Sequence, residues 1–281
     1  MFSRFLRFCI YKMSHVNRIR KKFMDLKKKR KKALIIFMTA GDPSLKKTAK
    51  LIPAFEKEGV DLIELGVPFS DPLADGPIIQ ASSQRSLARG TNLKKIIQLV
   101  KNVRKSSQIP LVLMSYLNPI WHYGLKRFAS EAKQAGVDGV IVPDLPPDEG
   151  KEIGFIFKRH GLDLIYLLAP TSNKIRQKRI SKESNGFVYY VSLTGVTGMK
   201  NKLSETLSTQ VRSAKKNSNL PVCVGFGVST PEQAEAVSKT ADGVIIGSAV
   251  VSGLHNHRHL DAEALSKKIV RPFAKALRKD R

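Results

Sequence analysis

Residues 33–65 read ALIIFMTAGDPSLKKTAKLIPAFEKEGVDLIEL, with two apolar runs separated by a turn and a lysine-rich amphipathic stretch. Each apolar run is continuous rather than alternating, which is typical of a parallel strand covered by helices. Asp42, Pro43 and Ser44 have the composition of a helix start, where proline is favoured near the first turn. The stretch therefore predicts one strand–helix–strand unit.

The same alternation of strand and helix continues almost to the C-terminus. The predicted strands are Ala33–Met38, Asp61–Leu65, Leu111–Ser115, Gly139–Val142, Asp163–Leu168, Phe187–Ser192, Pro221–Gly225 and Gly243–Ile246. The predicted helices are Leu45–Glu58, Leu93–Lys105, Leu125–Ala135, Asp148–His160, Ile175–Lys182, Leu203–Lys216, Pro231–Lys239 and Asp261–Lys279. Eight such strands in a chain of 281 residues predict an α/β fold, the (β/α)8 TIM barrel.

An open doubly wound sheet is the rival arrangement, and it usually carries a GxGxxG turn after its first strand. The corresponding turn here is TAGDPS, residues 39–44, which does not match that pattern. An amphipathic segment at about Asn17–Leu26 predicts an extra N-terminal helix at the bottom of the barrel. No break in composition divides residues 13–281, which are expected to form a single catalytic domain. Residues 1–12 are interpreted as a disordered extension or a misassigned start, with Met13 as the alternative start.

The composition excludes several classes of protein. An apolar fraction of 42% and a charged fraction of 26% are typical of a soluble globular protein. No apolar run reaches the roughly 18 residues of a transmembrane helix. The two cysteines, Cys9 and Cys223, make no disulfide framework and are interpreted as reduced thiols. A cytoplasmic location is therefore expected.

The formal net charge of +26 comes from 49 Lys and Arg against 23 Asp and Glu. Part of this excess is concentrated near the N-terminus, in Arg18, Arg20, Lys21, Lys22, Lys27, Lys28, Lys29, Arg30, Lys31 and Lys32. Two interpretations stay open: a solvated basic surface, or a weak attraction for nucleic acid or another acidic partner. No specific nucleic-acid binding is predicted.

Active sites of (β/α)8 barrels lie at the C-terminal ends of the strands and in the loops that follow them. Glu64 ends the second predicted strand within an otherwise apolar run, so its carboxyl is expected to point into the barrel mouth. Burial there raises the pKa of a carboxyl toward the range of a general acid or base. A structural carboxylate paired with a neighbouring hydroxyl is the alternative interpretation.

The loop after this strand, DPLADGP at residues 71–77, offers further acids. Asp71 precedes a proline and is interpreted as a turn residue. Residue types alone leave Asp75, which precedes a glycine, equally compatible with a turn and with catalysis. Two carboxyl groups in different environments can divide acid and base roles, so Glu64 and Asp75 are the candidate pair.

Glycines at three consecutive strand ends indicate a phosphate site. The residues concerned are Gly195, Thr197 and Gly198 after the sixth strand, Gly225 and Gly227 after the seventh, and Gly247 and Ser248 after the eighth. Glycines let backbone N–H groups approach an anion, and a short helix starting at Ser248 would present its N-terminus to it. Barrels of this class build their phosphate site at this place.

Other chemistries lack their residues. A Schiff-base aldolase needs a lysine at a strand end, and only Lys200 and Lys202 in the sixth loop come near this requirement. His255, His257 and His259 are interpreted as surface histidines rather than metal ligands. No GxSxG, Walker-type or CxxC motif is present. What remains is metal-free acid/base chemistry on a phosphorylated, partly apolar substrate.

Seven runs together resemble the α subunit of tryptophan synthase, in the order of that family. They are FMTAGDP (37–43), ELGVPFSDPLADGPIIQ (64–80), LMSYLNPI (113–120), VPDLPPDE (142–149), YVSLTGVTG (190–198), GFGVS (225–229) and GSAVV (247–251). The resemblance covers about residues 13–280. It implies retro-aldol cleavage of indole-3-glycerol phosphate into indole and glyceraldehyde 3-phosphate. Glu64 would be the general acid/base, and Asp75 would hold the indole N–H.

The resemblance also implies the surroundings of this pair. The indole pocket would be lined by Phe37, Tyr116, Ile141, Tyr189 and Phe226, the phosphate would be bound by Gly198, Gly227, Gly247 and Ser248, and Thr197 would close the sixth loop over Asp75. Two positions depart from some members of the family. Phe187 stands where those members carry tyrosine and Leu193 where they carry arginine, which affects the details of loop closure.

A partner follows from the same resemblance. The family implies an α2β2 heterotetramer with a β subunit that holds pyridoxal phosphate, while the present chain would need neither cofactor nor metal. Indole would pass between the subunits, and the docking surface would involve about Pro68–Pro77, Asn118-Pro119 and Asp144–Pro147.

Four other functions are weighed against this one. Indole-glycerol phosphate synthases and sugar-phosphate epimerases would need catalytic lysines or metal-binding histidines at strand ends. A degenerate barrel kept only to activate the β subunit would be expected to lose Glu64 or Asp75, and both are present. A nucleic-acid binder would show steeply salt-dependent binding.

Overall fold

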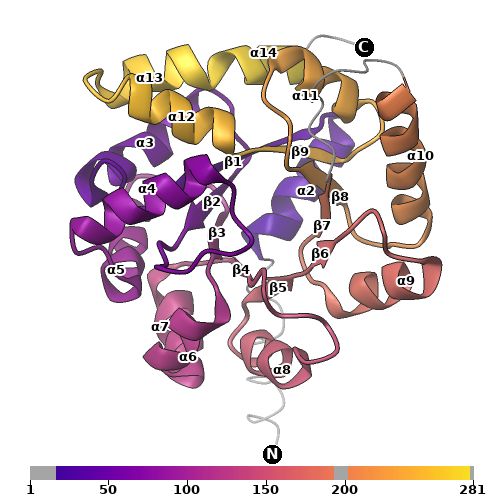
Figure 1. Ribbon diagram of the computed structural model, residues 1–281, viewed down its shortest axis with the longest axis horizontal. Coiled ribbons are helices and arrows are strands. Elements are labelled where there is room, and N and C mark those ends of the chain that lie inside the picture. Colours follow the sequence, from indigo (N-terminus) through magenta and orange to yellow (C-terminus); the bar gives the residue numbers. More distant parts are fainter. Residues whose placement is uncertain (1–16, 193–201, 279–281) are drawn as a thin grey trace, which may run out of the picture.

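The computed structural model describes residues 17–192 and 202–278, and its parallel strands form a ring surrounded by helices (Figure 1). The strands are β1 (Ala33–Thr39), β2 (Leu62–Gly66), β3 (Leu111–Met114), β4 (Gly139–Ile141), β5 (Asp163–Ile165), β6 (Leu167–Leu168), β7 (Val188–Val191), β8 (Val222–Gly225) and β9 (Gly243–Ile246). Their order around the sheet is β5-β4-β3-β2-β1-β9-β8-β7-β6, and every pairing is parallel.

The ring closes through the fifth predicted strand, which is divided into β5 and β6. β5 pairs with β4, β6 pairs with β7, and only Tyr166 separates the two parts. The backbone N–H of Tyr189 on β7 donates to the carbonyl of Tyr166 at 3.2 Å. The predicted (β/α)8 barrel is therefore confirmed, with eight strand positions around the ring.

The helices follow the strands in the expected alternation. They are α2 (Arg18–Lys28), α3 (Leu45–Lys57), α4 (Pro77–Ala88), α5 (Leu93–Val103), α6 (Leu117–Tyr123), α7 (Leu125–Ala135), α8 (Lys151–Arg159), α9 (Lys174–Glu183), α10 (Lys202–Lys216), α11 (Pro231–Ser238), α12 (Ser248–Asn256), α13 (Ala262–Ile269) and α14 (Arg271–Arg278). Among these described helices, none is long and apolar enough to cross a membrane.

Three helical details differ from the sequence prediction. The expected helix Asp261–Lys279 is two helices, α13 and α14, because Pro272 lacks a backbone N–H and restricts the residue before it. The apolar pattern does not predict α4, which buries Ser82, Ser83 and Ser86 instead of apolar residues. It does not predict α6 either, which has only seven residues.

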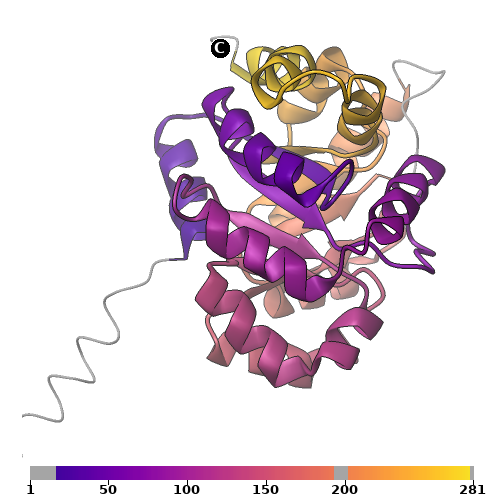
Figure 2. The same cartoon turned by 90° about the vertical axis from the view of Figure 1, so that its left-hand side faces the viewer.

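The apolar core has two layers. The larger one lies between the strands and the outer helices, and the smaller one fills the inside of the barrel. Ile19, Phe23 and Leu26 of α2 belong to the inner layer, and the Phe23 ring lies 5.8 Å from that of Phe187 on the β7 segment. Figure 2 shows α2 and α4 at opposite ends of the barrel. The extra N-terminal helix thus closes the end where strands begin, called the basal end here, opposite the mouth where strands end.

Three aspartates at the basal end tie neighbouring strands together in the same way. Asp61, Asp138 and Asp242 each come immediately before or near the start of a strand, and each accepts a hydrogen bond at 3.0 Å from a backbone N–H at the start of the neighbouring strand. Their partners are Leu34, Leu111 and Val222, respectively. In each pair the aspartate N–H also donates to the partner's carbonyl, at 2.9 Å. We call each such pair of bonds an aspartate clasp; it fixes the register of two adjacent strands.

Candidate active site

Glu64 lies on β2 beside Phe37 of β1 and Val112 of β3, within the ring of strands. Its side chain is completely buried, and neither carboxyl oxygen has a hydrogen-bond partner within the described part of the chain. Burial raises the pKa of Glu64 to about 8, because the charged form is poorly solvated there. The carboxyl is therefore mostly protonated at neutral pH and can donate a proton.

Asp75 lies in the loop between β2 and α4, half-buried near the mouth of the barrel. The Tyr116 hydroxyl donates to Asp75 Oδ2 at 3.3 Å and accepts from the Ala74 N–H at 2.8 Å. Burial raises the pKa of Asp75 to about 6, while the hydrogen bond from Tyr116 opposes this shift. Asp75 is therefore mostly ionised at neutral pH, in contrast to Glu64. Asp71 is exposed, and its backbone carbonyl accepts a hydrogen bond from the Leu73 N–H at 3.0 Å, as expected of a turn residue.

Tyr189 is the aromatic residue of β7 that faces the inside of the barrel. It is buried, and its pKa is raised well above its ordinary value, first by burial and then by the charges of Glu64, Cys223 and Asp75. Its ring packs against that of Phe226, with ring centres 5.9 Å apart. Tyr189 and Phe226 thus form an apolar wall inside the barrel, beside the ends of β7 and β8.

The other residues expected to line an indole pocket lie around this place. Phe37, Ile141 and Tyr189 belong to the apolar layer inside the barrel, and Phe226 packs against that layer. Tyr116 precedes α6 and packs its ring 5.3 Å from that of Phe69. Its hydroxyl bond to Asp75 is a feature that residue pattern alone did not indicate, because the two residues are 41 positions apart.

The described part of the expected phosphate site lies at the ends of β8 and β9. Gly227 has φ +80°, and Phe226 before it has φ +65°, so the backbone turns sharply through the left-handed region. Gly247 precedes α12, and Ser248 is its exposed first residue. The first N–H groups of a helix have no acceptor inside the helix and favour an anion. The arrangement is therefore suited to a phosphate group.

Several predicted residues lie outside the described part of the chain. These are Cys9, Leu193, Gly195, Thr197, Gly198 and Lys200, together with the whole of residues 1–12.

The histidines after β9 do not form a ligand cluster in the described structure. The rings of His257 and His259 meet edge to face, with 6.2 Å between their centres, just after the end of α12, and His259 is exposed. Within residues 17–192 and 202–278, no three His, Cys, Asp or Glu side chains gather closely enough to hold a metal ion. Cys223 is buried on β8 inside the barrel, as its apolar surroundings in the sequence suggest.

Serines fix the helix that follows the Asp75 loop. Ser82 and Thr39 hydroxyls are 2.5 Å apart, and the Ser86 hydroxyl donates to the Ala40 carbonyl at 2.6 Å. These bonds attach α4 to the end of β1, so the start of α4 at Pro77 and the loop before it have a defined position. Gly76-Pro77 is the sequence signal that could have found this helix, because proline is favoured in the first turn.

Comparison with known proteins identifies relatives along nearly the whole barrel. A family profile described as tryptophan synthase alpha chain matches residues 23–278. The tryptophan synthase alpha chain of Geobacter sulfurreducens is 52% identical over 236 residues, which are 84% of this chain and 89% of that protein. The corresponding protein of Pelobacter propionicus is 46% identical over 263 residues, or 94% of this chain and 97% of that one.

Solved structures agree with these sequence matches. Tryptophan synthase subunit alpha from Legionella pneumophila superposes with a TM-score of 0.87 at 39% identity, covering 94% of this chain and 99% of that one. A chain of tryptophan synthase from M. tuberculosis, in an aminoacrylate-bound form, gives 0.83 at 32% identity and covers 94% and 100%. The region that the family profile matches, residues 23–278, runs from within α2 to the end of α14.

Proposed function

The chain belongs to the tryptophan synthase alpha chain family, and we propose that it cleaves indole-3-glycerol phosphate with Glu64 and Asp75 as its catalytic residues. The products are indole and glyceraldehyde 3-phosphate, so the reaction is that of a carbon–carbon lyase. The observation that carries this assignment is the contrast between the two carboxyl groups. Glu64, with a pKa of about 8, is protonated near neutral pH, whereas Asp75, with a pKa of about 6, is ionised.

Proton transfer is the role of Glu64. Its carboxyl gives a proton to the indole ring carbon that carries the side chain, which makes the ring nitrogen an electron-poor iminium. The resulting carboxylate then takes the proton of the side-chain hydroxyl next to the scissile bond. The carbon–carbon bond breaks, its electron pair flows into the ring toward nitrogen, and the former hydroxyl carbon becomes the aldehyde. Glu64 thus gives one proton and receives one, and ends the cycle unchanged.

Charge stabilisation is the role of Asp75. The carboxylate accepts a hydrogen bond from the indole N–H. This hydrogen bond strengthens as positive charge develops on the nitrogen. Tyr116 fixes the orientation of Asp75 through the hydrogen bond to Oδ2. Phe37, Ile141 and Phe226 provide apolar contacts for the ring, while the backbone at Gly227, Gly247 and Ser248 binds the phosphate.

The assay that tests this proposal measures indole released from indole-3-glycerol phosphate. Glu64→Gln keeps the shape of the side chain but cannot transfer a proton, so we expect kcat to fall by about 10²–10⁴-fold. Asp75→Asn removes the negative charge and should lower kcat by about 10²–10³-fold. The matched control is Asp71→Asn in the same loop, which should keep activity within about twofold because Asp71 is exposed. Full activity in Glu64→Gln would overturn the mechanism.

A β subunit that holds pyridoxal phosphate is the proposed partner, in an α2β2 assembly. Large apolar side chains are exposed on the segments expected to dock: Leu73 is 84% exposed in the Asp75 loop, and Trp121 is 66% exposed on α6. The Leu117 N–H donates to Asp144 Oδ1 at 2.9 Å, which connects the start of α6 to the loop after β4. Exposed apolar patches commonly mark protein interfaces. Indole released in the mouth would then pass directly into the partner.

Sedimentation of the mixed subunits tests this interface. Leu73→Asp should weaken the complex at least tenfold, because a charge is buried against the partner. Met24→Asp is the control, since Met24 is also exposed but lies on α2 at the basal end. Equal weakening by both variants would contradict docking at the mouth. A cytoplasmic location is part of the proposal and accords with the reduced-thiol interpretation of the cysteines.

A further inference from the structure

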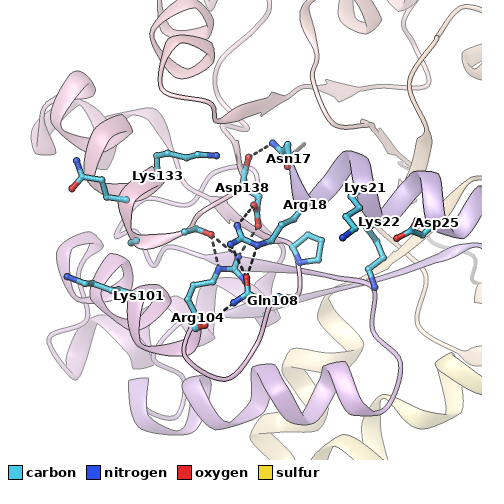
Figure 3. Close-up of a pocket in the computed structure, with 14 residues that line it drawn as sticks. Asn17, Arg18, Lys21, Lys22, Asp25, Lys101, Arg104, Gln108, Lys133 and Asp138 are labelled. Carbon is cyan, nitrogen blue, oxygen red and sulfur yellow. Dashed lines mark hydrogen bonds and ion pairs between the residues drawn. The ribbon is translucent and has the colours of Figure 1, made fainter. Parts of the chain in front are cut away.

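A second pocket lies at the basal end of the barrel, remote from Glu64. Its volume is about 700 Å³, within the range of small-molecule sites. It is bounded by α2, α5, the segment after α5, and α7 with the turn that follows (Figure 3). Nothing in the proposed lyase reaction uses this pocket.

The floor of the pocket is a rigid network of charged groups. Arg18 Nη1 and Arg104 Nη2 each donate to a different oxygen of Asp138, both at 2.9 Å, as Figure 3 shows. Arg18 also donates twice to Gln108 Oε1, at 3.1 and 3.0 Å. Arg104 further donates to the carbonyls of Gly136 and Ile109. The two guanidinium groups are therefore held by the protein and provide fixed positive charge rather than free donors.

The lysines around this floor are the available groups. The pocket is lined by six basic side chains, namely Arg18, Lys21, Lys22, Lys101, Arg104 and Lys133, against the two acids Asp25 and Asp138. Lys22 forms an ion pair with Asp61 at 3.7 Å. Within the described residues, no ion pair or hydrogen bond occupies the ammonium groups of the exposed Lys21 and Lys101. Lys133 donates to the Gly161 carbonyl at 2.8 Å, which leaves two of its three protons. The lining residues thus carry a net excess of four positive charges, one of which, that of Lys22, is shared with Asp61, and they offer unsatisfied ammonium donors.

We propose that this basal pocket binds a small anion that carries two or more linked phosphate groups. An excess of four charges suits such an anion better than a single phosphate, and ammonium groups bind phosphate as point charges. The fourteen lining residues include no aromatic ring, so no side chain is placed to stack on a nucleobase. The polyphosphate group itself is therefore the recognised feature, whether or not a nucleoside is attached.

Calorimetric titration of the full-length protein with tripolyphosphate tests the proposal. Wild type should show saturable binding at one site that weakens as salt is added. Lys21→Glu/Lys101→Glu removes the excess charge of the pocket and should weaken binding at least tenfold. The control is Lys50→Glu/Lys268→Glu, which makes the same change of net charge at exposed positions on α3 and α13. Both double variants should retain indole release, which reports that they are folded.

Four results would overturn the proposal. Equal affinity in both double variants would show that only the overall charge attracts the anion. Loss of tripolyphosphate binding when the mouth is saturated with glyceraldehyde 3-phosphate would place the anion in the substrate site. Binding of a single-stranded RNA without binding of tripolyphosphate would indicate an extended nucleic-acid surface instead of a pocket. ATP should bind about as tightly as tripolyphosphate, and a preference of more than tenfold for ATP would contradict recognition through phosphate alone.

Discussion

The basal end and the mouth of the barrel treat buried carboxyl groups in opposite ways. At the basal end, the nearly inaccessible carboxylate of Asp138 accepts hydrogen bonds from Arg18, Arg104 and the Leu111 N–H. At the mouth, Glu64 is equally buried and has no hydrogen-bond partner within the described residues. A satisfied carboxylate stabilises the fold, whereas an unsatisfied one is available to a substrate.

The difference teaches that burial alone does not identify a catalytic acid. Asp61 and Asp138 are buried polar residues like Glu64, yet each is engaged in an aspartate clasp. Glu64 differs from these aspartates in three respects together: it is buried, it has no hydrogen-bond partner within the described residues, and it lies near the end of its strand at the mouth. Barrel enzymes generally place stability at the basal end and chemistry at the mouth, and the proposed roles of Asp138 and Glu64 follow that division.

The largest expected effect compares Asp138→Ala with Glu64→Gln. Removal of the Asp138 carboxylate leaves the largely buried Arg104 and the Leu111 N–H without this acceptor, so the free energy of unfolding should fall by about 3–5 kcal/mol. Glu64→Gln should not lower the free energy of unfolding at neutral pH, because the fold already favours the uncharged form of this side chain. Urea denaturation measures both. A greater loss of stability in Glu64→Gln would break the comparison.

The next effect concerns stability at different pH. The folded pKa of Glu64, about 8, lies above its ordinary value of 4.5, so the fold favours the protonated form. Its contribution to stability is full below about pH 4.5 and is lost as the pH rises through 8. Glu64→Gln should abolish this loss. Between pH 5 and pH 9, the free energy of unfolding should therefore fall more in wild type than in the variant, by at least ~1 kcal/mol. Urea denaturation measures the free energy of unfolding of both proteins at the two pH values. An equal loss in wild type and in Glu64→Gln would contradict a raised pKa of Glu64.

A smaller effect is expected for catalysis in Tyr116→Phe. The pH profile of kcat/KM in wild type should rise as Asp75 ionises near pH 6 and fall as Glu64 ionises near pH 8. The hydroxyl of Tyr116 lowers the pKa of Asp75, so its removal should move the acidic limb to higher pH and reduce kcat about tenfold. Tyr123→Phe, at the end of α6, is the control. An acidic limb that stays in place would show that Tyr116 only packs in the mouth.

The smallest effect is expected at the surface. Lys57 and Glu263 form an ion pair at 3.5 Å in which both side chains are largely exposed. Lys57→Ala should change the free energy of unfolding by less than about 0.5 kcal/mol, because exposed pairs are screened by water and salt. Thermal unfolding beside Asp138→Ala provides the measurement. A loss of stability comparable to that of Asp138→Ala would mean that burial does not determine how much these ion pairs contribute to the free energy of unfolding.

The barrel was predictable because its strands are short apolar runs that differ sharply from the lysine-rich helices. Each of the eight predicted runs contains a strand, and only the fifth is divided, at Tyr166. Helix α4 escaped prediction because its buried face is made of serines whose hydrogen bonds to the β1 segment replace apolar contact. Periodicity detects apolar faces and has no means of detecting such a polar one.

Prediction of the site had a similar limit. Glu64 could be identified because an acid at the end of an apolar strand must be buried or face the mouth. The chemical contrast with Asp75 could not be derived, because it depends on which groups surround each carboxyl. The hydroxyl of Tyr116 reaches Asp75 across 41 residues of chain, and no local pattern records that contact. The aspartates that form the clasps were equally invisible, since their partners lie at the starts of neighbouring strands.

The aspartate clasps have a consequence for how the chain folds. The two residues of each clasp are 27, 27 and 20 positions apart in the chain, so each clasp encloses one strand and the one or two helices that follow it. Closing loops of this length costs only modest entropy, and contacts between residues near in the chain form early. Each unit can therefore acquire its own register before the ring is complete. For these three strand pairs, folding then consists of joining units that are already aligned.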